Sequence, residues 1–325
     1  MPALAGGRHD ALAAALTRVG LRGARTVALL KHHPGSRCTL AIAAGTDRYV
    51  VKLFADAAKV LALSAVHQVL AGAGLASGRG PTVPRLIGVD TDAALLVTEM
   101  YAAPATTELI ERGECDRAGR LAAQWLRAAA TPGLTLGDPY DPRHALEEIH
   151  RYVCTIASAA GELGGRAGAV WDRLAADIPP PGYSDLRHGS LYLSHVFDLG
   201  DGPGVIDWDS FRQGPVEVDA GMMSAMAARW AVRRPAHAGA AQRAIAVFLD
   251  EVRDLVDPAR LRWYRAAVGS SANPFCDHLP GRPARTDAAG HAQLPARGRR
   301  PWPAPRRRDA PLIESTRSSI NEATG

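Results

Sequence analysis

The chain has 325 residues, of which 47% are hydrophobic, so it is long enough for two domains and apolar enough to bury a core. No stretch approaches the apolar run that spans a bilayer, and four separated cysteines without a C-x-x-C pair argue against a zinc site or a disulfide framework and fit a reducing cytoplasm. Most of the net charge of +5 comes from the end of the chain, where nine arginines after residue 272 face five acidic residues, so it does not predict a nucleic-acid-binding face.

The first part of the chain predicts a small antiparallel sheet with one helix. The opening 20 residues predict an amphipathic helix rather than a signal peptide, with a transit peptide as the alternative. Residues 26–54 predict strands, because their apolar runs are interrupted by the turn-like clusters HPGS and AGTD. Residues 55–75 predict a helix that ends at glycines, and VPRLIGVD and ALLVTEM predict two further strands. We assign this first domain to residues 1–101.

The second part of the chain is predominantly helical in its pattern. Residues 105–130 and 143–177 predict helices, and residues 216–268 predict about three more. Short strand-like pieces lie between them, around residues 195–207. A β-rich domain followed by a helical domain at 102–270 predicts two lobes with a cleft between them.

The last part of the chain, residues 271–325, is rich in proline, glycine and arginine and has few apolar residues. Such a composition cannot bury enough surface to offset the entropy of ordering, so we predict a disordered basic tail. An out-of-frame extension of a truncated last helix is the alternative. The basic residues of the chain include only three lysines, Lys31, Lys52 and Lys59, which makes a well-placed lysine informative, because its ammonium is a compact point charge.

Several residues suit phosphoryl transfer, which needs positioning and electrostatic stabilisation. Lys52 lies in the strand YVVKLF, where an ammonium group would bind nucleotide phosphates; a solvent-facing strand lysine is the alternative. Gly35 and Ser36 lie in the turn of KHHPGSRCTL, earlier in the same run of strands. Its backbone N–H groups would cover phosphate oxygens, although an ordinary hairpin turn is the favoured explanation from these residues alone. Asp207 follows the apolar end of a strand and would bind magnesium, with a loop or capping aspartate as the alternative. Asp209 would share its face if the strand continued.

Three motifs in the second part occur in the order and at the spacing of a known family. HGSLYLSHVF, VIDWDSF and GPVEVDAG follow one another, and HPGSRCTL before YVVKLF and LLVTEM at the lobe junction also fit. Over about residues 20–265 the chain resembles the aminoglycoside phosphotransferase and choline kinase-like family, relatives of protein kinases. The resemblance implies a bilobal protein kinase-like α+β fold, with ATP and Mg²⁺ as ligands.

The resemblance also implies roles for single residues. Lys52 would bind phosphates and Asp207 would bind magnesium. The segment from Glu99 to Tyr101 would form the hinge that binds adenine. His188 would have the structural role of the loop histidine, and Asp219 would be a structural carboxylate.

The chain departs from the family pattern in its catalytic loop. Ser190 stands where the family has the aspartate that accepts the hydroxyl proton, and a serine cannot accept a proton near neutral pH. His195 stands where the family has the magnesium-binding asparagine, and imidazole prefers softer ions, so its metal role is doubtful. The helix at 55–75 contains no glutamate to pair with Lys52.

Two carboxylates, Asp185 and Asp209, are possible surrogates for the missing base. Ser190 as a hydrolase nucleophile is a further alternative, but tyrosine stands at position 192, where a G-x-S-x-G elbow needs glycine. We therefore predict ATP-dependent phosphoryl transfer to a hydroxyl of a small molecule, with activity weak or lost. The alternative is a catalytically inactive pseudokinase that binds nucleotide, a small molecule or a protein partner. Neither nucleic acid nor a membrane is an expected partner.

Overall fold

A computed structural model describes the chain over residues 9–130 and 133–271. The predicted opening helix is present as α1 (His9–Arg18), and its first eight residues lie outside the described residues. The predicted tail, apart from its first residue, also lies outside them, so its disorder stays a prediction. Within these two ranges, no helix combines the length and the apolar character that crossing a membrane requires.

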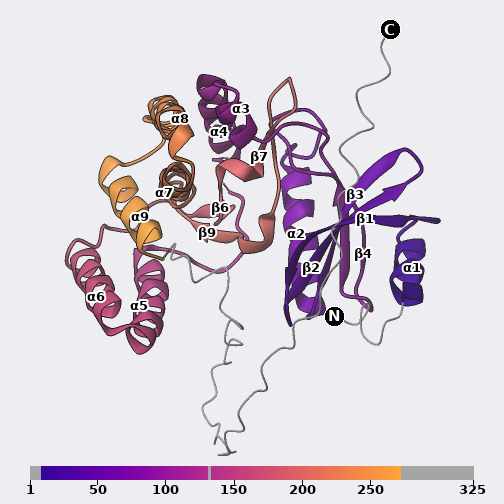
Figure 1. Cartoon of the computed structure of the whole chain (residues 1–325), viewed down its shortest axis with the longest axis horizontal. Coiled ribbons are helices and arrows are strands. Elements are labelled where there is room, and N and C mark those ends of the chain that lie inside the picture. The colour runs from indigo at the N-terminus through magenta and orange to yellow at the C-terminus, as the bar shows by residue number, and fades with distance from the viewer. Residues whose placement is uncertain (1–8, 131–132, 272–325) are drawn as a thin grey trace, which may run out of the picture. The chain divides into compact units, whose positions relative to one another are not determined.

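A five-stranded antiparallel sheet forms the first part of the chain, as predicted (Figure 1). In chain order its strands are β1 (Arg25–His33), β2 (Arg37–Ala44), β3 (Asp47–Phe54), β4 (Leu86–Asp90) and β5 (Leu95–Glu99). Their spatial order is β1-β2-β3-β5-β4, and every neighbouring pair is antiparallel. Strand β1 is therefore an edge strand, and its two register shifts are typical of edges that resist further pairing.

Both faces of the sheet are covered by helices, because apolar side chains alternate along the inner strands. Leu53 and Leu95 pack in one buried cluster with residues of α1. Their neighbours Phe54 and Leu96 point to the other face and pack in a second cluster with α2 (Ala57–Gly72). Figure 1 shows α1 and α2 on opposite sides of the sheet.

The rest of the described chain is mostly helical and includes seven α-helices. They are α3 (Thr106–Glu111), α4 (Cys115–Ala129), α5 (Pro142–Ala159), α6 (Gly161–Ala176), α7 (Glu217–Arg233), α8 (Ala238–Glu251) and α9 (Pro258–Ser271). The predicted helix at 105–130 is divided at Gly113, whose φ of +87° ends α3. The predicted helix at 143–177 is divided at Ala160, which has an extended backbone.

Two short hairpin-like pairs lie among the helices and carry the loops of interest. Strand β7 (Val196–Asp198) pairs with β8 (Pro203–Val205), in the region where strand-like pieces are predicted. Strand β6 (Asp185–Arg187) pairs with β9 (Arg212–Gly214), and this pair was missed by sequence reasoning because three residues show no periodicity. Two single 3₁₀ turns, η2 (Leu193–His195) and η3 (Trp208–Ser210), follow β6 and β8 in the chain.

One buried cluster joins the sheet to the helical part. It contains Phe54 and Leu96 from the sheet together with Leu109, Trp125 and Phe248 from α3, α4 and α8. The observed architecture is thus the predicted α+β combination of a small antiparallel sheet and a helical remainder. The predicted boundary at residue 101 falls in the connection between β5 and α3 and stays a prediction.

Candidate active site

Lys52 lies on β3 with its ammonium group buried between two aspartates. Its Nζ donates to Asp207 at 2.6 Å and to Asp209 at 2.5 Å, and its side chain is 14% exposed. Burial lowers the pKa of Lys52, and the neighbouring carboxylate of Asp207 opposes that shift. The solvent-facing alternative for Lys52 is therefore wrong.

Asp207 follows β8 on an unusual backbone. Its φ of +68° lies in the left-handed region, which a residue other than glycine adopts rarely and often at functional sites. Although burial alone would raise the pKa of Asp207, the charge of Lys52 and its hydrogen bond hold this pKa well below its usual range. The strand does not continue to Asp209, as considered from the sequence; the turn η3 instead brings the second carboxylate back to Lys52.

Two further basic side chains contact Asp209. Arg37, the first residue of β2, forms an ion pair with Asp209. Lys59 on α2 donates to the backbone carbonyl of Asp209 at 2.6 Å. Helix α2 has no glutamate to pair with Lys52 and contributes a cation instead. The carboxylates that pair with Lys52 come from outside this helix. We call Arg37, Lys52, Asp207 and Asp209 the ion cluster.

The loop of residues 188–195, called the catalytic loop after its predicted role, is held by hydrogen bonds to buried groups. The carboxylate of Asp219 accepts from the backbone N–H groups of His188 and Gly189 at 2.9 and 2.8 Å. His188 is fully buried, and its Nε2 lies 2.8 Å from the carbonyl of Ile206, so this nitrogen donates. Burial lowers the pKa of His188, which favours the neutral ring. His188 therefore braces the loop against the residue that precedes Asp207.

His195 reaches the edge of the ion cluster, and Ser190 is joined to it within the loop. Ser190 is half-buried, and its Oγ lies 3.4 Å from Nδ1 of His188. His195 donates through Nδ1 to the carbonyl of Ser190 at 2.9 Å, and its Nε2 lies 3.6 Å from Asp207. Burial lowers the pKa of His195 to about 4, so it is neutral at pH 7. The ring of His195 therefore lies between the loop and Asp207, with its unprotonated Nε2 facing the carboxylate.

Both candidate surrogate carboxylates are buried and paired with cations. Asp185 is 2% exposed, pairs with Arg187 at 3.3 Å and accepts from the backbone of Gly133 at 3.2 Å. Asp209 is 7% exposed and has one oxygen on Lys52 and the other on Arg37. A carboxylate committed to a cation is a poor base, because the cation stabilises its ionised form.

The turn and hinge residues predicted to bind nucleotide lie on the sheet. Gly35 and Ser36 form the turn between β1 and β2, next to Arg37, and Ser36 N–H donates within the turn to His33 at 3.0 Å. Glu99 ends β5, and its N–H donates to the carbonyl of Arg85. Tyr101 follows it in the connection to α3 and packs against Phe197, with ring centroids 5.8 Å apart.

A metal would depend mainly on Asp207. The side chain of Asp207 is 26% exposed, and a carboxylate oxygen suits Mg²⁺. In the ranges 9–130 and 133–271, no group of three or more His, Cys, Asp or Glu side chains could hold a metal ion. That finding fits a magnesium site in which substrate phosphates supply most ligands, but not one that the protein encloses alone.

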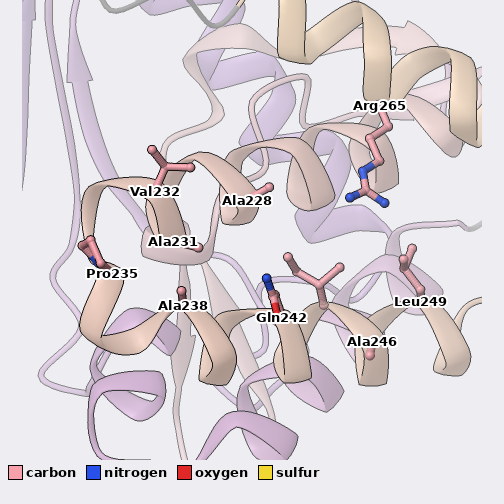
Figure 2. A pocket seen from close by; sticks show the side chains of 10 residues that line it. Ala228, Ala231, Val232, Pro235, Ala238, Gln242, Ala246, Leu249 and Arg265 are labelled. Atoms are coloured by element: carbon pink, nitrogen blue, oxygen red, sulfur yellow. The ribbon is translucent and has the colours of Figure 1, made fainter.

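A separate groove lies among the C-terminal helices (Figure 2). Residues of α7, α8 and α9 and the turn between α7 and α8 line it, mostly alanines and aliphatic side chains. Its polar groups are the amide of Gln242 and the guanidinium of Arg265, which point into the space between the helices. Because none of the ion cluster lines it, this groove adds nothing to the site built around Lys52.

Sequence reasoning missed Arg37 and Lys59. A signal existed for Lys59, because it is one of only three lysines in the chain. Arg37 had a weaker signal: it directly follows the glycine-containing turn that was expected to cover phosphates. The pairing of Asp209 with both cations could not be found, since it joins residues that are more than 150 positions apart.

Several solved structures of phosphotransferases superpose on this chain. The crystal structure of aminoglycoside-3'-phosphotransferase of type VIII superposes with a TM-score of 0.56 at 21% identity, over 80% of this chain and 98% of that chain. Aminoglycoside phosphotransferase APH(3'')-Id from Streptomyces rimosus gives a TM-score of 0.51 at 17% identity, over 79% and 95%. The streptomycin–ATP complex of APH(2")-IIa gives 0.53 at 10%, over 80% and 86%. These likenesses confirm the predicted kinase-like fold.

Sequence comparison leads to the same family. None of the curated proteins matches the chain. The model of the phosphotransferase enzyme family matches residues 37–264, which is more than half of the chain and includes the ion cluster and the catalytic loop. The chain therefore belongs to the phosphotransferase enzyme family.

Proposed function

We propose that the chain binds ATP with Mg²⁺ and transfers the γ-phosphoryl group slowly to a hydroxyl of a small molecule. The observation that carries this proposal is the ion cluster, in which Lys52 of the sheet and Asp207 after β8 meet at 2.6 Å. Family membership and the ATP that is bound in one structural neighbour support it. Aminoglycoside-like, sugar-like and amino-alcohol acceptors are all compatible with the family.

In this proposal each residue near the cluster has a defined task. Lys52 binds the α and β phosphates, and the turn at Gly35 and Ser36 covers them. Asp207 holds Mg²⁺, which when bound neutralises charge on the phosphates. Because Nδ1 of His195 donates to the loop, its Nε2 has a free lone pair 3.6 Å from Asp207, which would be available to a metal ion held there. The adenine binds at the backbone of Tyr101, since the N–H groups of the two preceding residues donate to protein carbonyls.

Within the described residues, Ser190 occupies the position expected for the base. It cannot take the hydroxyl proton, and a missing base costs about 10²–10⁴ in rate. Two acidic side chains of the helical part are already engaged: Glu148 pairs with Arg212 at 3.2 Å, and Asp219 holds the loop backbone. The same observations favour the second candidate, an inactive pseudokinase that still binds nucleotide.

Restoring the base distinguishes the two candidates. We expect Ser190→Asp to raise the rate of phosphate release from Mg²⁺–ATP, with water as acceptor, by roughly 10²-fold, because it supplies the missing carboxylate. Turnover would be measured by phosphate release, and ATP binding by the thermal shift of the same protein. As a control, Ser190→Asp combined with Asp207→Asn should lose the gain, because asparagine keeps the backbone geometry without the charge.

Each result of that experiment favours one candidate. A gain that depends on Asp207 supports slow phosphoryl transfer. ATP binding without turnover in either protein would leave the nucleotide-binding pseudokinase. If neither protein binds ATP, both candidates are wrong.

A further inference from the structure

Several basic residues gather around Lys52 on the sheet and on α2. Lys31 on β1 is paired with Thr39 of β2, and Thr39 is paired with Lys52 of β3, so the two lysines lie in one row across the sheet. Arg37 lies two residues before Thr39 and therefore on the same face. Lys52 and Arg37 contact the carboxylates of the ion cluster, and Lys59 from α2 donates to the backbone carbonyl of Asp209.

The choice of residue types makes this arrangement informative. The chain has 38 basic residues, and only three of them are lysines. All three, Lys31, Lys52 and Lys59, belong to the group just described. Lysine therefore appears only where compact charges converge, and a compact ammonium is suited to phosphate oxygens.

Arg37 and Lys52 lie on the two oxygens of one carboxylate, that of Asp209, so their positive charges are held close together. Arg37 directly follows the turn that contains Gly35 and Ser36. Its guanidinium group could therefore exchange its ion pair with Asp209 for a phosphate, while Asp209 keeps its bond to Lys52. Guanidinium binds phosphate through two parallel hydrogen bonds, which a point charge cannot do.

On the other side, the protein supplies few ligands for divalent metal. Asp207 is the exposed carboxylate, Asp209 is occupied by two cations, and His195 stands where an oxygen ligand is expected. We infer that Arg37, together with Lys31 and Lys59, binds the phosphate chain directly, so that a nucleoside triphosphate binds this protein without a divalent cation. This inference rests on the proposed function and extends it from the metal-bound to the metal-free nucleotide.

Calorimetric titration of the full-length protein with ATP tests it, in one series with excess Mg²⁺ and in another with excess EDTA. We expect saturable binding in both series. In EDTA, Arg37→Gln should raise the Kd at least about 10-fold, because a charge-assisted hydrogen-bond pair is lost. Arg37→Lys should restore part of the affinity, since lysine returns the positive charge without the two parallel donors of the guanidinium group. Arg25→Gln, at the far end of β1, is the matched control and should leave the Kd unchanged.

The probe and its competitors identify what is recognised. Inorganic tripolyphosphate should compete with ATP in EDTA, and AMP should not, because the cations face the phosphate chain. Binding with Mg²⁺ but not with EDTA would overturn the inference and leave the proposed function standing. An unchanged Kd for Arg37→Gln in EDTA would also overturn it. Absence of binding in both series would instead refute the nucleotide site as a whole. Circular dichroism of each variant verifies that it is folded.

Discussion

His67 is a buried residue on α2 whose surroundings do not favour its charged form. It is 8% exposed; burial, followed by the charge of Lys52, lowers its pKa to about 4, while a bond to the backbone of Pro84 opposes this. In the unfolded chain a histidine titrates near 6.5, so the unfolded state binds more protons between these values. The native state is therefore fully stable above pH 6.5 with respect to His67 and loses that contribution as the pH falls toward 4.

We expect His67→Gln to flatten the dependence of stability on pH in this window. Glutamine keeps a donor for the Pro84 carbonyl but cannot be protonated, so about 3 kcal/mol of pH-dependent loss should disappear. Urea unfolding at a series of pH values between 4 and 7 measures the slope. The exposed His32 gives the control, His32→Gln, which should keep the wild-type slope. An equal slope in His67→Gln and wild type would contradict this account.

The catalytic loop is an element whose geometry depends on one glycine. Gly189 has φ +73°, and a Cβ there would lie 2.2 Å from the carbonyl oxygen of Ser210. Gly45, in the turn between β2 and β3, also has a positive φ of +62° but has open space around its Cβ position. Comparing alanine substitutions at the two glycines therefore distinguishes the cost of backbone strain from the cost of close packing.

We expect Gly189→Ala to destabilise the protein much more than Gly45→Ala. Gly45→Ala should cost about 1–2 kcal/mol, the cost of the left-handed backbone alone. Gly189→Ala adds the displacement of the turn η3, which contains Ser210, from the loop, and its chemical-denaturation midpoint should fall further. Comparable midpoints for the two variants would mean that the loop is free to move away from Ser210.

Among the elements, those with long periodic patterns were predictable from sequence and the short ones were not. The strands of the sheet, with apolar runs interrupted by turn clusters, lie where predicted. The breaks at Gly113 and Ala160 were missed, because the apolar pattern on both sides continues through them. The pair β6 and β9 was missed because each strand has three residues, and its pairing depends on residues far apart in sequence.

At the scale of the whole molecule, the two halves of the site come from distant parts of the chain. Motif order could predict that Lys52 and Asp207 act together, since both belong to recognisable motifs. It could not predict the ion pair between Arg37 and Asp209, because that contact depends on how the sheet packs against the loop after β8. Sequence motifs thus indicate which residues belong to the site. Packing determines which of their charges are paired within the protein and which can bind a ligand.

That packing also predicts how the molecule unfolds. Leu96 of β5 is 2% exposed and belongs to the same buried cluster as Trp125 of the helical part, and Trp125 contacts Trp208 at a centroid distance of 5.7 Å. We expect Leu96→Ala to cost about 2–5 kcal/mol, as large-to-small substitutions in cores do. Because the core is shared, tryptophan fluorescence and far-UV circular dichroism should shift to lower urea together.

The control for this last prediction is Leu29 on the edge strand β1, which is 59% exposed. Leu29→Ala should leave both midpoints in place, because it removes little buried surface. If Leu96→Ala moved the circular dichroism transition alone, the sheet would unfold while the helical part stayed folded. The ion cluster would then join two independently unfolding parts, and nucleotide binding would have to hold them together; coincident shifts mean that the buried core already does so.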